Sequence, residues 1–190
     1  MKTQLELNTP LDITEIDFRV QSVNKGGYAT ILAYKDARVD MKRLDDVCGV
    51  EYWQKKYDLI DNHLFCSVGI WNEKLNQWIW KQDVGTESNT EKEKGEASDA
   101  FKRACFNLGI GRELYEYPLI QVQLIQGQAD EKLNEFDKVT GKPTWNFKLK
   151  EWVWFSQFTD GKLTYLGCKD NNGKVRFQFG KLNNELKKAA

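Results

Sequence analysis

Several features that would indicate a common chemistry are missing from this sequence. It has a single histidine, His63, and its four cysteines include no C-x-x-C pair, whereas a zinc site needs about four clustered nitrogen or sulfur ligands. No glycine-rich loop ends in Gly-Lys-Ser/Thr, so a Walker-type nucleotide site is not indicated. We therefore expect no metal and no cofactor, and we expect any activity to be independent of ATP.

Long apolar runs are also missing. No stretch approaches the length that spans a membrane, and the N-terminal residues do not resemble a signal peptide. Scattered cysteines in such a chain are typical of reduced, mostly buried thiols in an intracellular protein. We expect a cytoplasmic protein that does not bind membranes.

The chain lacks net charge as well, since 28 Lys and Arg balance 28 Asp and Glu. A zero sum argues only weakly against a polyanionic partner, because the distribution of charge matters more. That distribution is uneven: residues 138–190 contain about eleven Lys and Arg against about four Asp and Glu. Hydrophobic residues make up 41% of the chain, which is enough for a packed core.

The order of local patterns predicts an α+β fold with antiparallel strands. We expect a hairpin over 18–34, a short helix over 36–49, a three-strand meander over 51–85 and a long helix that ends near 108. One more strand is predicted after Pro118, and three hairpin-linked strands over 151–179. We predict a core domain over 1–126, a polar linker or loop over 127–145, and a basic C-terminal β segment over 146–190.

The long helix has the clearest pattern. Thr90 is a plausible N-cap, and Gly109 and Gly111 are placed to end the helix. One face repeats small or apolar residues at spacings of three and four, namely Ala97, Ala100, Phe101, Ala104, Cys105 and Leu108. Because most of these side chains are small, the helix can approach a sheet closely. Lys102 and Arg103 stand side by side in its middle.

Cations and aromatic residues alternate through the first half of the chain. A groove for single-stranded nucleic acid needs both, because aromatic rings stack on bases and cations neutralise phosphates. Alone this is a weak signal, since strand aromatics usually form a core and helix cations usually face solvent.

A more specific signal lies in residues 83–111, which resemble the signature of the Rad52/Rad22 family of single-strand annealing proteins. The matching positions are Asp83-Val84-Gly85, Glu91-Lys92, Ala97, Asp99, Lys102-Arg103-Ala104, Gly109 and Gly111. Arg19, Tyr34 and Gly49 match upstream positions more loosely. The resemblance covers roughly residues 15–118 and is nearest in style to the short bacteriophage members, which would place the protein in a bacterial host.

The resemblance implies a β-β-β-α core, assembly into a homo-oligomeric ring, and single-stranded DNA held in a basic groove for annealing during recombination and repair. It implies no catalytic residues. In this interpretation the helix pair Lys102 and Arg103 binds phosphates. The full set of predicted DNA-binding residues is Arg19, Tyr34, Lys35, Arg38, Lys42, Arg43, Lys94, Lys102, Arg103 and Arg112.

Two positions depart from the family pattern. Phe106 stands where some members carry a further arginine, and Arg112 or Lys94 is the candidate to replace it. His63 stands where the family's outer DNA site needs a lysine. The resemblance further suggests a phage exonuclease or a host single-strand binding protein as partners.

Two alternative functions stay open. A metal-dependent nuclease that acts on DNA ends would use Asp83, Glu87, Glu91 and Asp99, although acidic residues near a helix start usually face solvent. A non-DNA interaction protein of a phage, built on a related fold, would need none of these side chains.

Overall fold

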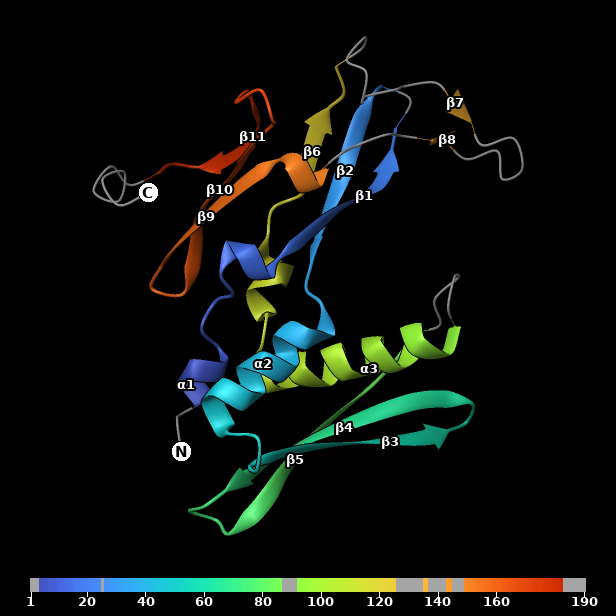
Figure 1. Ribbon diagram of the computed structural model, residues 1–190, viewed down its shortest axis with the longest axis vertical. Helices are drawn as coiled ribbons and strands as arrows, with labels where there is room; N and C mark the ends of the chain where they lie inside the picture. Colours follow the sequence, from blue (N-terminus) through green and yellow to red (C-terminus); the bar gives the residue numbers. More distant parts are fainter. Residues whose placement is uncertain are drawn as a thin grey trace. The chain divides into compact units, whose positions relative to one another are not determined.

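The computed structural model describes residues 4–24, 26–86, 92–125, 135–136, 143–144 and 149–182 of the 190-residue chain. The chain divides into two compact units, and each is built from separate stretches of sequence. Unit 1 comprises Met1–Glu15 and Lys35–Arg112, and unit 2 comprises Ile16–Tyr34 and Glu113–Ala190. Figure 1 shows the elements of both units, and we describe each unit by itself.

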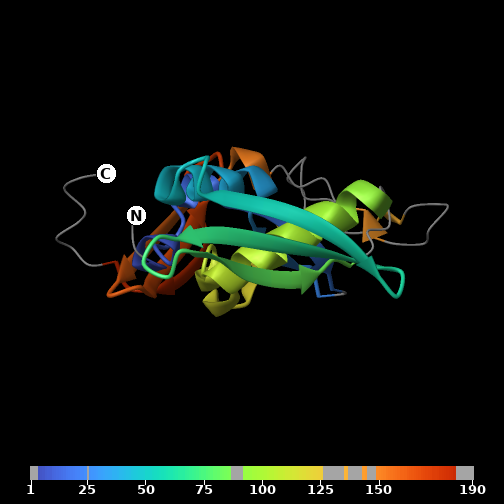
Figure 2. The same cartoon turned by 90° about the horizontal axis from the view of Figure 1, so that it is seen from below.

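Unit 1 is a three-stranded antiparallel meander covered on one face by helices (Figure 2). Its elements in chain order are α1 (Gln4–Leu7), η1 (Ile13–Glu15), α2 (Ala37–Cys48), β3 (Trp53–Ile60), β4 (His63–Asn72), β5 (Gln77–Val84) and α3 (Lys92–Leu108). The strand order is β3-β4-β5. Asp61 and Asn62 have φ values of 50° and 61°, which is the backbone geometry of a two-residue hairpin turn.

Helix α3 packs against β4 and β5, and α2 packs against α3. The predicted apolar face is confirmed: Ala100, Phe101, Ala104, Cys105 and Leu108 are all buried, and Ala97 is half-buried. The ring of Phe101 lies 6.3 Å from that of Trp53 on β3. The helix ends at Gly109 with φ 112°, where a Cβ would fall 1.5 Å from the side-chain oxygen of Asn8. The predicted N-cap, Thr90, lies outside the described residues.

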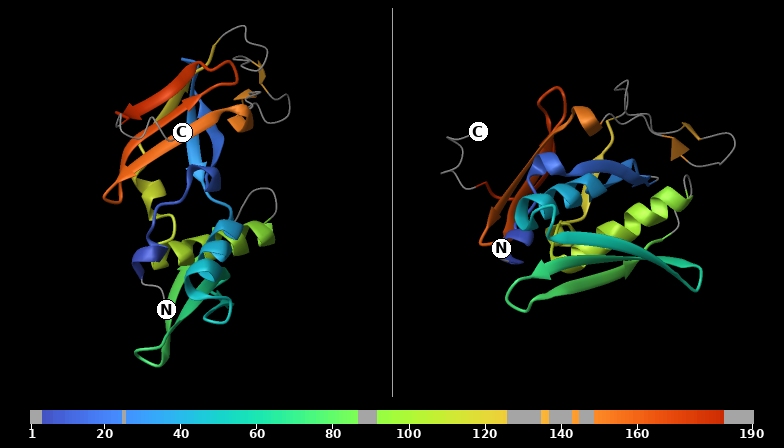
Figure 3. Two further views of the ribbon diagram at one scale, coloured as in Figure 1. Left: turned by 60° about the vertical axis from the view of Figure 1, so that its left-hand side comes forward. Right: turned by 60° about the horizontal axis from the view of Figure 1, so that its bottom comes forward.

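Unit 2 combines the N-terminal hairpin with the C-terminal strands (Figure 3). Its elements are β1 (Asp17–Val23), β2 (Tyr28–Tyr34), η2 (Arg112–Glu116, whose first residue belongs to unit 1), β6 (Ile120–Gln123), β7 (Glu135–Phe136), β8 (Pro143–Thr144), η3 (Leu149–Glu151), β9 (Val153–Thr159), β10 (Lys162–Lys169) and β11 (Val175–Gly180). The strands form the sheets β1-β2-β6, β11-β10-β9 and β7-β8, with antiparallel pairing throughout.

Two contacts join the sheets of unit 2. The ring of Phe18 on β1 stacks on that of Trp154 on β9, with centroids 3.6 Å apart and planes 3° from parallel. Arg176 on β11 donates from Nη2 to the carbonyl of Gln123 on β6, at 2.9 Å. The C-terminal strands therefore share a core with the N-terminal hairpin.

The described elements confirm an α+β protein with antiparallel sheets. The hairpin over 18–34, the helix over 36–49, the meander and the C-terminal strands are all present. The domain boundary predicted at 126 lies outside the described residues, as does most of the linker predicted over 127–145, so these divisions stay predictions. No helix among the described residues is long and apolar enough to cross a membrane.

Candidate functional site

The signature segment ties α3 to the end of β5 through a second face of the helix. Asp83 on β5 accepts hydrogen bonds from Arg103 Nε at 3.2 Å and from Asn107 Nδ2 at 3.0 Å. Asp99, one turn before Arg103, accepts both the backbone N–H and the hydroxyl of Thr86, at 3.0 and 2.9 Å. Positions 99, 103 and 107 follow one another at a spacing of four and so share a face. Several signature residues thus position the helix.

The absence of a side chain at Gly85 allows the end of β5 to approach α3 closely. A Cβ at this position would lie 2.3 Å from the backbone oxygen of Glu96 on α3, so a larger side chain would push the strand end away from the helix. The backbone N–H of Gly85 donates to the carbonyl of Leu64 at 2.9 Å. Glu96 Oε1 accepts from the backbone N–H of Leu64 at 3.0 Å, so at least one of the helix-start acids serves the fold.

Lys102 lies on the third face of α3, toward the start of α2. Its charge has a minor effect on two carboxyl groups there. Hydrogen bonds from Arg38 are the main reason that the pKa of Asp36 is lowered, and burial raises the pKa of Asp40 against the smaller opposing effects of Lys35 and Lys102. Lys102 is half-exposed and makes no ion pair with any residue in the described part of the chain. Arg103 is also accessible, with 42% of its side chain exposed, but its ion pair with Asp83 partly balances its charge. Lys102 is therefore the stronger candidate for a contact to an external anion.

Two further predicted cations stand exposed on α2. Arg38 is 87% exposed and pairs with Asp36, the N-cap of the helix, at 2.8 Å. Lys42 follows one turn later, 70% exposed, and pairs with Asp46. Ion pairs this exposed are weak, so a phosphate can compete for either cation. The side chain of Lys94 lies outside the described residues.

Lys35 does not fit the role predicted from the sequence. Only 7% of it is exposed, and its ammonium group pairs with Asp40, which is fully buried. Its aliphatic stem packs over Gly111, where a Cβ would lie 2.7 Å from Lys35 Cε. Burial raises the pKa of Asp40 to about 6, against the lowering effect of the Lys35 ammonium. Because a phosphate cannot reach a buried and paired ammonium, we remove Lys35 from the candidate interface.

Arg43 is also used inside the unit. Its side chain is 14% exposed and lies 3.6 Å from Glu15 Oε2. Its guanidinium donates to the carbonyl of Thr9 at 2.7 Å, and more weakly to that of Glu6 at 3.4 Å. It therefore holds the N-terminal segment against α2, and we remove it from the candidate interface as well.

Arg112 stands beside the position where the family arginine is missing. Its guanidinium carbon lies 5.8 Å from the centroid of the Phe106 ring. Nε and Nη2 donate to the carbonyls of Phe106 and Asn107, both at 2.9 Å, and so cap the last turn of α3. The residue remains exposed. Arg112 therefore lies beside Phe106, and its role in place of the family arginine stays a prediction.

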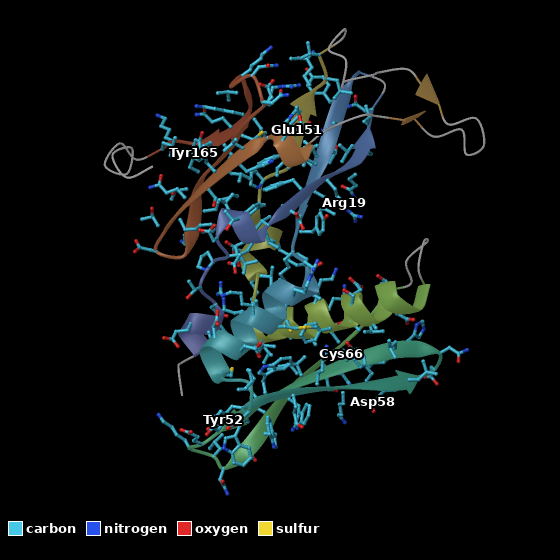
Figure 4. All side chains as sticks on the ribbon, viewed as in Figure 1. Arg19, Tyr52, Asp58, Cys66, Glu151 and Tyr165 are labelled. Carbon is cyan, nitrogen blue, oxygen red and sulfur yellow. The ribbon has the colours of Figure 1, made fainter. Side chains whose placement is uncertain are left out.

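Arg19 and Tyr34 belong to unit 2. Both are exposed, on neighbouring strands β1 and β2, and the Arg19 guanidinium lies 5.4 Å from the Tyr34 ring centroid. Figure 4 labels Arg19 on β1. An arginine over an aromatic ring can contact a phosphate and a base together. The predicted residues therefore divide between the two units, with Lys102, Arg103, Arg38, Lys42 and Arg112 remaining in unit 1.

The acids of the nuclease alternative do not converge in the described part of the chain. Asp83 and Asp99 are both engaged by donors from α3 or the preceding loop, and Glu87 and Glu91 lie outside the described residues. Among the residues described, no three His, Cys, Asp or Glu side chains are placed to hold one metal ion.

One member of this network was missed from the sequence. Asn107 donates from Nδ2 to the Gln82 carbonyl and to Asp83, at 3.1 and 3.0 Å. Its position four residues after Arg103 is the signal that could have identified it.

Residues 1–133 match the model of the Rad52/22 family of double-strand break repair proteins. The chain is also similar to the single-stranded DNA-binding protein DdrA of Deinococcus radiodurans, with 30% identity over 118 residues. That match covers 60% of this chain and 55% of DdrA, so the chain spans about half the length of this curated relative.

Proposed function

The chain belongs to the Rad52/22 family of double-strand break repair proteins, and we propose from this membership that it binds single-stranded DNA in recombination and repair. The observation that carries the proposal is the placement of the signature cations: Lys102 is accessible and has no ion-pair partner among the described residues, while Arg103 beside it is only partly balanced by Asp83. The similarity to DdrA, whose name states single-stranded DNA binding, supports it.

We propose that the backbone of the strand contacts the exposed cations of unit 1, which are Lys102, Arg103, Arg38, Lys42 and Arg112. Arg19 and Tyr34 of unit 2 are proposed as further contacts, and Lys94 as a cation of the same helix. Annealing follows if two strands are held extended with their bases free to pair, which needs no ATP and no covalent step. A ring of subunits would repeat each cation and so build a basic track from a neutral chain.

The first test compares wild type with Lys102→Ala/Arg103→Ala by fluorescence anisotropy of a labelled single-stranded oligonucleotide across a salt series. We expect a loss of affinity of at least tenfold at low salt. Each phosphate contact to a single strand contributes about 0.7 to the slope of log affinity against log salt, so the slope should flatten by about 1.4. A duplex of equal length should bind more weakly to the wild type.

Lys56→Ala/Lys74→Ala is the matched control. Both lysines are exposed and belong to unit 1, and Lys56 lies over the ring of Trp80, on the face of the meander that α3 does not cover. This variant should keep the affinity and slope of wild type. Thermal unfolding must accompany both variants, because Arg103→Ala also removes a partner of Asp83. Equal binding by the folded Lys102→Ala/Arg103→Ala variant would place the DNA site elsewhere.

Asp83→Asn separates strand binding from the nuclease alternative. The amide keeps an oxygen that can accept from Arg103 or Asn107 but removes the charge that balances Arg103. We expect single-strand affinity to hold or rise several-fold. A nuclease that depended on Asp83 for its metal would instead lose Mg²⁺-dependent degradation of DNA ends, so a wild type that degrades DNA and a variant that does not would support that alternative.

A further inference from the structure

One face of the C-terminal sheet of unit 2 carries exposed side chains around a buried centre, which is formed by Tyr165 and Gly167. Register places Val153 and Val175 on either side of Lys169, and Phe155 and Gln178 on either side of Gly167. Val153 and Val175 are each 52% exposed and Phe155 is 41% exposed, while Lys169 and Gln178 are exposed too. The opposite face packs inward through Trp154, Leu166 and Cys168.

Gly167 and Tyr165 keep this face flat at its centre. A Cβ on Gly167 would lie 2.5 Å from the hydroxyl oxygen of Tyr165, so the phenol ring lies along the central strand over the glycine. Figure 4 labels Tyr165 on β10, the middle strand of this sheet. Because Tyr165 is itself buried, the groups that can contact the faces of unpaired bases are the exposed ring of Phe155 and the valines at positions 153 and 175.

Cations surround this face. Lys162, Lys169, Lys174 and Lys181 are all exposed, and none makes an ion pair with another residue of the described ranges. Two acids near these strands, Glu151 and Asp160, are exposed, whereas Asp170 is buried and paired with Arg176. The four exposed lysines therefore outnumber the exposed acids.

We propose that this face, defined by Val153, Phe155, Lys169, Val175 and Gln178 with Lys162, Lys174 and Lys181 at its margins, is a second binding surface for single-stranded DNA. The inference rests on the proposed function, because it supplies a place for a second strand. The exposed lysines are complementary in charge to a polyanion. The exposed Phe155 and valines favour a single strand, because its bases are unpaired and accessible, whereas the bases of a duplex are stacked inside it.

The experiment uses the full chain and a quadruple variant in which Lys162, Lys169, Lys174 and Lys181 are replaced by alanine. Protein is first saturated with an unlabelled dT oligonucleotide, and capture of a second, labelled dT oligonucleotide is followed by anisotropy. We expect wild type to capture the second strand and the variant to lose at least tenfold in second-strand affinity, while first-strand affinity changes less than threefold. Lys56→Ala/Lys74→Ala, made of exposed lysines of unit 1, should behave like wild type.

Phe155→Ser tests the contact to bases. Wild type should hold second-strand dT more tightly than an abasic strand of equal length, and Phe155→Ser should remove that preference. If a labelled duplex binds to the C-terminal face as tightly as the dT oligonucleotide does, the proposal that this face prefers a single strand is overturned.

The failures are distinguishable. If wild type binds no first strand, the proposed function fails. If it binds the first strand but the quadruple variant captures the second strand as well as wild type, only this inference fails. If wild type binds the first strand and captures no second strand, the C-terminal face is not a DNA surface.

Discussion

Replacing Lys35 with methionine is expected to lower the free energy of unfolding by about 3–5 kcal/mol at pH 8, the cost of removing one partner of a buried ion pair. Asp40 is fully buried, and the Lys35 ammonium is the charge that opposes the effect of its burial. Methionine keeps the unbranched stem that packs over Gly111, so the loss reports on the charge and its hydrogen bond. Urea denaturation followed by circular dichroism measures it.

The pH dependence of this loss has a definite sign. Burial already raises the pKa of Asp40 to about 6 with Lys35 in place, and without Lys35 the pKa rises further. Below pH 6 the carboxyl is protonated in both proteins, so little charge is left without a partner. Above pH 6 wild type ionises Asp40 beside its partner, whereas the variant must either hold a proton or bury a lone carboxylate. The loss should therefore be larger at pH 8 than at pH 5.

A second substitution keeps this prediction falsifiable. Lys35→Met/Asp40→Leu removes both charges and should recover most of the stability, because buried pairs are often replaceable by apolar residues. Lys42→Met, on the exposed face of α2, should leave unfolding almost unchanged. If Lys35→Met unfolds like wild type but loses single-strand affinity, Lys35 contacts DNA after all and its buried position is not the functional one.

Local sequence patterns were enough to predict most of unit 1. The spacing of Ala100, Phe101, Ala104 and Cys105 identified the buried face of α3, and Gly49 and Gly109 were placed correctly at helix ends. These features depend on neighbours within one helical turn, so the sequence contains the information directly. The paired strands of the meander follow in the same way from their turn residues.

The state of each cation could not be predicted in this way. Lys35, Arg43 and Lys102 all count as cations in the sequence, but their surroundings differ. Lys35 is buried against Asp40, Arg43 donates a hydrogen bond to the carbonyl of Thr9, and Lys102 is half-exposed. Their partners come from other elements, and only the packed fold brings them together. Composition counts therefore overstated the basic interface.

Contacts between distant segments also explain why the sequence did not predict that the N-terminal hairpin and the C-terminal strands belong to one unit. The sequence suggested a separate C-terminal segment, because the polar stretch over 127–145 interrupts the strand pattern. Arg176 counted toward the basic surplus of that segment, but its guanidinium forms an ion pair with Asp170, and its Nη2 donates a hydrogen bond to the carbonyl of Gln123 on β6. A side-chain contact between strands of two different sheets, from residues 53 positions apart, leaves no periodic trace in the sequence.

Arg176→Met is expected to lower the free energy of unfolding of unit 2 by about 2–4 kcal/mol at pH 7. The guanidinium lies 3.2 Å from Asp170, donates to Gln123, and lies 4.6 Å from the ring centroid of Trp152. Methionine can fill part of the space but donates no hydrogen bond. It leaves the Asp170 carboxylate, which is 2% exposed, without its cation. Chemical denaturation with tryptophan fluorescence measures the change.

At acidic pH, wild type and Arg176→Met should differ less in their free energy of unfolding. Although burial by itself raises the pKa of Asp170, the backbone N–H groups of Lys174 and Asn172 together with Arg176 lower it below its ordinary value. A lowered pKa stabilises the folded state above about pH 4 and loses that contribution as pH falls through the folded value. In Arg176→Met the pKa rises, so protonation removes the unpaired charge earlier and the variant approaches wild type at low pH.

Arg19→Met is the matched control, since Arg19 is an exposed arginine of the same unit and its ring contact with Tyr34 is worth only about 0.5–1 kcal/mol at an exposed site. Arg176→Met/Asp170→Asn should recover part of the loss, because the amide oxygen can still accept from Asn172 and Lys174. The number of unfolding transitions shows whether the C-terminal strands unfold together with the rest of unit 2. A single shifted transition would mean that β6 and β11 unfold together, because Arg176 joins them. A C-terminal transition that moves alone would instead support the predicted boundary at residue 126.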